Sequence, residues 1–213
     1  MTDRVVLATR NEHKIIELRR ILQSAGLAVD LVGTEEFPDL PEVAETGTTF
    51  AANALLKARD VASRTGLVAI ADDSGLSVDA LNGMPGILSA RWAGRHGDDN
   101  ANLSLLLAQL ADVPTQRRSA AFHCAAAVAT PEGDERVVEG VLEGSIVEQP
   151  RGENGFGYDP IFAPSGYALT TAQLTPDEKD AISHRGKAFR ALVPVLADLL
   201  GDRSNADRSP RRE

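Results

Sequence analysis

The amino-terminal third of the chain alternates between short apolar runs and segments with helical spacing. Runs typical of buried strands cover residues 4–9, 27–32 and 67–71, and apolar side chains recur at helical spacing over residues 15–25 and 48–64. Two longer β-favouring runs, 119–129 and 136–147, flank turn-forming residues at 131–134 and predict a hairpin. This order predicts an α/β protein with a mixed β-sheet.

The remaining segments are assigned from their apolar spacing and from the residues that begin or end helices. A further strand is expected at 76–81, a helix around 103–110, and a last helix over 187–200. Thr175, Pro176 and Glu178 form the sequence pattern of a capped helix start. With no internal repeat or interdomain linker, residues 1–201 are expected to form one domain, and residues 202–213 a disordered tail.

Composition excludes several classes of function. The 213 residues include 22 basic and 31 acidic side chains, and a net charge of −9 argues against binding to duplex nucleic acid. No apolar stretch approaches the roughly 18 residues of a membrane span, and the N-terminus does not resemble a secretory signal. A single cysteine, Cys124, leaves no intrachain disulfide and favours a reducing cytoplasm. A small anionic ligand remains compatible with this composition.

Ligands of α/β sheets bind beyond the carboxyl ends of strands, which directs attention to the loop after the first strand. The segment Thr9, Arg10, Asn11, Glu12, His13 and Lys14 joins that strand to a helix. A helix N-terminus suits a phosphate, and Lys14 adds a full positive charge there. The alternative is a polar cap, Asn11, with an incidental surface lysine.

Two carboxylates, Asp72 and Asp73, are predicted to end the apolar strand 67–71. Mg²⁺ binds through one or two carboxylates together with substrate phosphates, so this pair is a candidate metal site. Glu45 is a possible third carboxylate in a neighbouring loop. A solvated turn is the alternative reading of the same residues.

Two later segments could hold a flat ring. Phe156, Gly157, Tyr158 and Asp159 place two aromatics in a glycine-rich stretch, and aromatic side chains stack on nucleobases. Lys179, His184 and Arg185 offer cations and hydrogen-bond donors. The alternatives are aromatics that fill a small core and charges that decorate helix ends.

In this order and register, the segments resemble the inosine triphosphate pyrophosphatase family, the XTP/dITP diphosphatases. The matching stretches are VVLATRNEHKIIEL, ETGTTFAANALLKA, IADDSGLSVDALNGMPGILSARWAG, GFGYDPIF and LTPDEKDAISHRGKAF, and they span nearly all of residues 4–200. The resemblance implies an elongated mixed β-sheet flanked by helices, with two lobes around a central cleft, and usually a homodimer. It also implies Mg²⁺-dependent hydrolysis of ITP, dITP and XTP to the monophosphate and pyrophosphate.

The resemblance also assigns residues. It implies that residues 9–14 grip phosphate, that Asp73 is proton acceptor and metal ligand, and that Glu45 lies near the metal. Ser74, Phe156–Asp159, Lys179, His184 and Arg185 match substrate contacts, and Asp72 is then a supporting residue. Many relatives carry glycine in place of Arg10 and an acid in place of Ala52.

These assignments give one hypothesis and two rivals. In the hypothesis, Asp73 accepts the proton of an attacking water, Lys14 stabilises charge on the phosphates, and His184 and Arg185 donate to a 6-keto group. The first rival is a pyrophosphatase for another modified nucleotide. The second is a nucleotide-binding regulatory module without catalysis.

Overall fold

The computed structural model describes the backbone of residues 2–207, and their side chains except those of His13 and residues 202–207. Within that range six strands form one sheet in the order β2-β1-β3-β4-β5-β6. They are β1 (Asp3–Leu7), β2 (Val29–Gly33), β3 (Val68–Val78), β4 (Ser119–Ala129), β5 (Glu135–Ile146) and β6 (Phe162–Pro164). Strand β1 is parallel to β2 and β3, and the other pairs are antiparallel. The predicted mixed sheet and the β4–β5 hairpin are confirmed.

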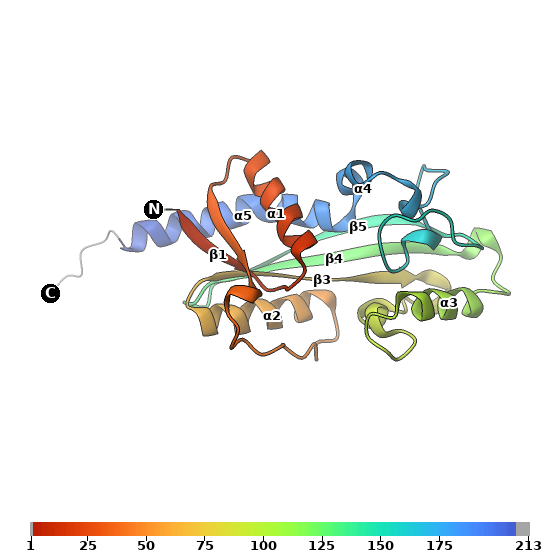
Figure 1. Ribbon diagram of the computed structural model, residues 1–213, viewed down its shortest axis with the longest axis horizontal. Coiled ribbons are helices and arrows are strands. Elements are labelled where there is room, and N and C mark those ends of the chain that lie inside the picture. The colour runs from red at the N-terminus through yellow and green to blue at the C-terminus, as the bar shows by residue number, and fades with distance from the viewer. Residues whose placement is uncertain (1, 208–213) are drawn as a thin grey trace.

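Helices cover both faces of this elongated sheet. They are α1 (Glu12–Ser24), α2 (Phe50–Thr65), α3 (Asp99–Gln109), α4 (Pro176–Ile182) and α5 (His184–Asp207). Short 3-10 helices are η1 (Thr34–Glu36), η2 (Asp79–Leu81), η3 (Gly86–Arg91), η4 (Thr115–Arg117), η5 (Asp159–Ile161) and η6 (Thr171–Gln173). In Figure 1, α1, α4 and α5 lie on one face of the sheet, and α2 and α3 on the other. No helix within residues 2–207 combines the length and apolarity that a bilayer crossing requires.

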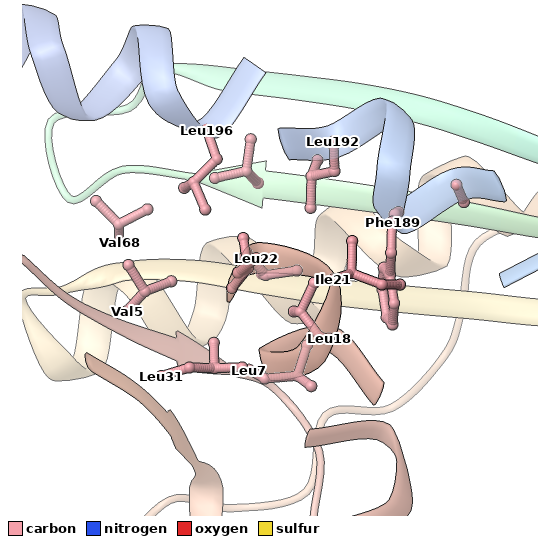
Figure 2. Close-up of a cluster of buried hydrophobic side chains, with 14 of the residues drawn as sticks. Val5, Leu7, Leu18, Ile21, Leu22, Leu31, Val68, Phe189, Leu192 and Leu196 are labelled. Atoms are coloured by element: carbon pink, nitrogen blue, oxygen red, sulfur yellow. The ribbon is translucent and has the colours of Figure 1, made fainter. Parts of the chain in front are cut away.

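Each face of the sheet has its own core. Under α1 and α5, Leu18, Leu22, Leu192 and Leu196 pack on Val5 and its strand neighbours, as Figure 2 shows. Their helical spacing places one apolar stripe of each helix on the sheet. Under α2 the contacts are mainly between alanines, which lets this helix approach the strands closely. A third cluster, which includes Leu76, Leu106 and Phe162, packs the end of the sheet near α3.

Helix boundaries near the candidate site follow from local caps. Thr175 and Glu178 form the predicted reciprocal capping box at the start of α4. Helix α5 begins at His184 rather than at the expected residue 187, because the Ser183 hydroxyl accepts a hydrogen bond from the Gly186 amide at 2.9 Å. It continues to Asp207, beyond the expected end at Leu200, so residues 202–207 are helical rather than disordered. Residues 208–213 of the predicted tail lie outside the described residues.

The prediction that a strand ends before Asp72 is wrong. One continuous strand, β3, runs from Val68 to Val78 and includes the first half of the strand expected at 76–81. The second half, Asp79–Leu81, is the 3-10 helix η2 rather than a strand. Strand β4 pairs with every residue from Ala69 to Val78 and satisfies the backbone there. Successive side chains of a strand point to opposite faces. Asp72 and Asp73 therefore lie on opposite faces of the sheet instead of forming one pair.

Candidate functional site

The candidate site lies where β1 ends and β3 continues. Strand β1 pairs with β3 only as far as Leu7 and Ile70, so the next residues of β3 have no strand on that side. Two cavities of about 570 and 580 Å³ open there, within the range typical of ligand pockets. We call the first the aromatic cavity; it includes Asn11, Lys14, Ser74, Phe122, Phe156, Gly157, Tyr158, Asp159, Lys179, His184 and Arg185. We call the second the cationic cavity; it includes Thr9, Arg10, Lys14, Glu45, Lys57, Asp72, Arg91 and His96.

Asp72 is a buried carboxylate held by two cations. Its oxygens each lie 2.9 Å from Lys14 Nζ, and Arg185 Nε lies 3.3 Å from Oδ2. Burial by itself raises the pKa of a carboxyl group, but the charges of Lys14 and Arg185 outweigh it and hold the pKa of Asp72 well below its ordinary value. Asp72 therefore stays ionised and orients both cations, since Lys14 lines both cavities and Arg185 lines the aromatic one.

The negative charge of Asp73, on the opposite face, is balanced less fully by neighbouring cations. It accepts a hydrogen bond from Asn53 Nδ2 at 3.0 Å, and Lys57 Nζ lies 3.9 Å from Oδ1. Lys57 Nζ also lies 2.7 Å from Glu45 Oε1, so the same ammonium group neighbours both carboxylates. Burial raises the pKa of Asp73 despite Lys57 and Asn53, and the charges of Glu45 and Asp72 add to the increase. This carboxylate is suited to accept a proton or to gain a further cation.

The donor set around Asp73 fits Mg²⁺. Two carboxylates, Asp73 and Glu45, share Lys57 as a neighbouring cation. Glu45 and Lys57 line the cationic cavity, whereas Asp73 lies beside them and lines neither cavity. Mg²⁺ is commonly held by one or two carboxylates, with the other positions filled by water and phosphate oxygens. Among the side chains that the structure describes, no group of three or more acidic, histidine or cysteine residues could hold a metal ion by itself. The site fits a metal that arrives with phosphate ligands.

The loop between β1 and α1 is organised by hydrogen bonds to its own backbone. Thr9 Oγ1 accepts from the Asn11 amide at 3.1 Å, and Asn11 Oδ1 lies 3.4 Å from the Lys14 amide. These contacts place Lys14 in the first turn of α1, as expected. Arg10 is exposed and lines the cationic cavity. Glu12 is exposed and lines neither cavity, and the side chain of His13 lies outside the described residues.

The loop around Phe156 places this ring, 59% exposed, at the aromatic cavity. Lys179 Nζ and Arg185 Cζ lie 5.1 and 5.9 Å from its ring centroid. Asp159 is buried and accepts hydrogen bonds from Lys179, from Thr171 Oγ1 at 2.8 Å and from the Phe156 amide at 2.8 Å. Asp159 thus fixes the loop and orients Lys179.

Tyr158 and Gly157 have structural contacts as well as a place in the cavity lining. Tyr158 is 4% exposed, packs in the cluster near α3, and donates its hydroxyl proton to the Ser89 carbonyl at 2.9 Å. The Gly157 amide donates to Asp99 Oδ2 at 2.8 Å. The sequence left open whether Tyr158 stacks on a ligand or fills the core. In the structure its side chain fills the core.

His184 and Arg185 occupy the first turn of α5 and line the aromatic cavity. His184 stacks on Phe122 at a centroid distance of 4.9 Å, and its Nδ1 is buried without a hydrogen-bond partner among the described residues. Burial, and then the charges of Arg185 and Lys179, lower the pKa of His184 well below its ordinary value. The ring is neutral near pH 7, and its Nδ1 can form a hydrogen bond with a ligand.

Four side chains of the site were missed by the sequence reasoning. Asn53 and Lys57 contact Asp73, and Arg91 and His96 line the cationic cavity. Asn53 and Lys57 are four residues apart and so share one face of α2, which is a signal that the sequence contains. Nothing in the local sequence around Arg91 and His96 shows that their loop returns to β3.

A mixed-sheet α/β chain with adjoining cationic and aromatic cavities is a protein built to hold a small anionic ligand with a flat ring. The family model described as the Ham1 family matches residues 5–195. The chain therefore belongs to the Ham1 family.

Individual relatives match over nearly their whole length. A Streptomyces coelicolor protein named dITP/XTP pyrophosphatase is 65% identical over 198 residues, which cover 93% of this chain and 99% of the relative. The crystal structure of a nucleoside-triphosphatase, dITP/XTP pyrophosphatase, from Mycobacterium abscessus has 59% identity and a TM-score of 0.78, and covers 91% of this chain and 99% of its own. A HAM1 protein from Coxiella burnetii has 42% identity and a TM-score of 0.86, with 92% and 100% covered.

Proposed function

We propose that this protein hydrolyses the non-canonical purine nucleotides dITP, XTP and ITP to the monophosphate and pyrophosphate, and so removes them from the nucleotide pool. One observation carries the proposal: Lys14 lines both cavities, so a ligand whose ring lies in the aromatic cavity extends its phosphates past Lys14 into the cationic cavity. The substrate class comes from the names of the close relatives.

Asp73 and Glu45 are the residues that would hold Mg²⁺ in this reaction. When bound, the metal supplies neutralisation of phosphate charge. Lys14 and the N-terminus of α1 stabilise negative charge that develops on the phosphate oxygens. Asp72 keeps the Lys14 ammonium in position through its two 2.9 Å contacts.

Asp73 is the proposed general base. A water oxygen forms a bond to phosphorus, the P–O bond to the pyrophosphate group breaks, and the proton of the water passes to Asp73. A buried carboxylate whose pKa is raised accepts a proton more readily than a fully solvated one. Asn53 orients this carboxylate through its 3.0 Å hydrogen bond.

His184 and Arg185 are proposed to select the base. A donor aimed at a 6-keto oxygen has no acceptor when adenine presents its amino group, and buried mismatches of this kind discriminate strongly. The test is the ratio of kcat/KM for ITP to that for ATP in His184→Ala and in Arg185→Ala. A ratio that falls by about tenfold or more in at least one variant supports the assignment. An unchanged ratio in both variants contradicts it.

The experiment that tests the function is pyrophosphate release by the purified protein with Mg²⁺ and with EDTA. The substrates are ITP, dITP and XTP, compared with ATP and GTP. We expect fast release from the first three with Mg²⁺, little from the last two, and none with EDTA. Tight nucleotide binding without any release would instead favour the regulatory module. Release only from a different modified nucleotide would favour the other rival. The homodimer and the cytoplasmic location stay predictions.

A further inference from the structure

Arg91 is a basic residue of the cationic cavity that the proposed mechanism does not use. Two cations of this cavity already have acidic partners, since Lys14 contacts Asp72 and Lys57 contacts Glu45. Arg91 is half-buried, and among the residues whose side chains the structure describes none forms a hydrogen bond or an ion pair with its guanidinium group. A guanidinium group presents a planar set of donors that matches phosphate oxygens. Its lack of a partner in a cavity indicates an anionic ligand.

The backbone that carries Arg91 is firmly attached to the sheet. In η3, Ser89 Oγ accepts from the Leu76 amide at 2.8 Å and lies 2.6 Å from the Gly86 carbonyl oxygen. Strand β3 can approach η3 this closely only because residue 75 is glycine: a Cβ there would lie 2.4 Å from the Gly86 oxygen. Arg91 thus stands on an element fixed to the strand of Asp72 and Asp73.

The residues that flank Arg91 are anchored to α3. Asn102, which is 1% exposed, accepts from the Ala93 amide at 2.7 Å and donates to the Ala90 carbonyl at 3.3 Å. Trp92 Nε1 donates to Gln109 Oε1 at 2.8 Å, so the side chain that follows Arg91 is hydrogen-bonded to α3. Residues on both sides of Arg91 are held by the protein, whereas Arg91 itself lines the cavity without a partner. This is the arrangement of a preorganised binding group.

The position of Arg91 identifies the part of the nucleotide that it meets. It lines the cationic cavity and is absent from the lining of the aromatic one, whereas Lys14 borders both. We propose that Arg91 binds the terminal phosphates of the nucleoside triphosphate and the pyrophosphate that leaves after cleavage. This inference rests on the proposed function for the identity of the ligand. Arg91 would then belong to a polyphosphate site that a nucleoside monophosphate does not reach.

The test compares Arg91→Ala with Arg95→Ala, in which an exposed arginine of the same loop that lines neither cavity is removed. Calorimetric titration with inorganic tripolyphosphate in EDTA excludes any contribution from metal. We expect Arg91→Ala to weaken tripolyphosphate binding by about tenfold or more, because charge-assisted hydrogen bonds are lost. Arg91→Lys should be intermediate, since it keeps the charge and loses the planar donors. Arg95→Ala should match the wild-type protein.

Inosine monophosphate is the second probe. Its affinity should be equal in wild-type, Arg91→Ala and Arg95→Ala proteins, because it lacks the terminal phosphates. Equal loss of affinity for inosine monophosphate and tripolyphosphate would overturn the inference, as would unchanged tripolyphosphate binding in Arg91→Ala. Undetectable tripolyphosphate binding by the wild-type protein would overturn it as well.

Hydrolysis separates this inference from the proposed function. In an active wild-type enzyme, Arg91→Ala should raise the KM for XTP and weaken product inhibition by pyrophosphate, each by about tenfold. If the wild-type protein hydrolyses no triphosphate, the proposed function fails, and the tripolyphosphate titration still decides the role of Arg91. If hydrolysis is normal and neither constant changes in Arg91→Ala, the inference alone fails.

Discussion

Asp72 and Asp73 are adjacent in the chain and face opposite sides of β3, so their carboxylates meet different cations. Asp72 is paired with Lys14 and Arg185, which holds its pKa low and keeps it ionised. Asp73 is buried with weaker compensation, and its pKa is raised. Groups with such divergent environments are suited to different tasks. The first is suited to orient cations, and the second to exchange a proton.

Replacing Asp73 by asparagine should remove most turnover and leave the fold intact. Loss of a general base typically costs about 10²–10⁴ in rate. Since burial disfavours the charge on Asp73, the neutral amide should not lower the free energy of unfolding. The measurements are kcat for XTP and the denaturant midpoint. Asp79→Asn, at an exposed position outside both cavities, is the matched control. A folded Asp73→Asn protein with near-normal turnover would contradict the assignment.

The buried neutral ring of His184 should make the fold sensitive to mild acid. Its pKa is lowered in the folded protein, so the unfolded chain takes up a proton first as the pH falls below about 6.5. The free energy of unfolding therefore falls with decreasing pH, by up to about 1.4 kcal/mol per pH unit. Asp72, whose pKa is also lowered, contributes stability that is complete above about pH 4 and is lost below it, outside this window.

The check is urea unfolding at intervals between pH 7 and pH 5. His184→Asn should be less stable throughout, because the stacking on Phe122 is lost, and its stability should depend less on pH than that of the wild-type protein. Identical slopes for the two proteins would show that His184 is not the titrating group.

At the scale of elements, helix termini deliver the charged side chains to the cavities. The first turn of α1 carries Lys14, α4 carries Lys179, and the first turn of α5 carries His184 and Arg185. Two of these starts depend on a side-chain cap that the sequence itself encodes, Thr175 for α4 and Ser183 for α5. A cap determines where a helix begins, so it also determines which residues face the site.

Thr175→Ala should loosen α4. Loss of an N-cap typically costs about 1 kcal/mol, and in a short helix this should appear as faster amide exchange across residues 176–182. Because Lys179 contacts Asp159 and covers the Phe156 ring, the KM for XTP should rise more than kcat falls. Glu178→Gln, which keeps the capping-box pattern, is the control and should behave as the wild-type protein. Unchanged exchange in Thr175→Ala would refute this account of α4.

At the scale of the whole molecule, the site depends on how closely α5 packs on β5. Gly140 lies under the first turns of α5, where a Cβ would be 2.1 Å from the His184 carbonyl oxygen and 2.5 Å from the Ala188 amide nitrogen. Both are backbone atoms, so they could make room only by moving the helix. The contact between β5 and α5 thereby determines how deep His184 and Arg185 reach into the aromatic cavity.

Gly140→Ala should displace α5 and damage both stability and binding. Overpacking of this kind costs about 1–3 kcal/mol, and the affinity for inosine monophosphate should fall because two residues of the cavity move. Gly201→Ala is the matched control, since nothing lies within 4 Å of a Cβ there and alanine favours a helix. Wild-type stability and affinity in Gly140→Ala would mean that this packing does not position the site.

Much of the architecture could be predicted locally. Periodicity placed β1, α1, β2, α2 and the β4–β5 hairpin, and the pattern Thr175–Pro176–Glu178 placed the start of α4. The chemistry of residues 9–14 and of the Phe156 loop was readable for the same reason, because ligand type follows from residue type. The end of β3 was misjudged, since charged residues normally mark a strand's end and the sequence does not show that β4 continues alongside them.

By itself, the sequence determined most of the segments that become strands and helices, although not where β3 ends or α5 begins. It also determined which side chains could bind phosphate, metal or a flat ring, because these properties depend on residue type and near neighbours. Only the tertiary structure decided that Asp72 and Asp73 face apart, that Lys57 joins Glu45 to Asp73, and that Arg91 returns to the same cavity. These relations come from packing between elements far apart in the chain. No local pattern encodes them, because burial and the approach of distant backbones set both the positions of the charges and their pKa values.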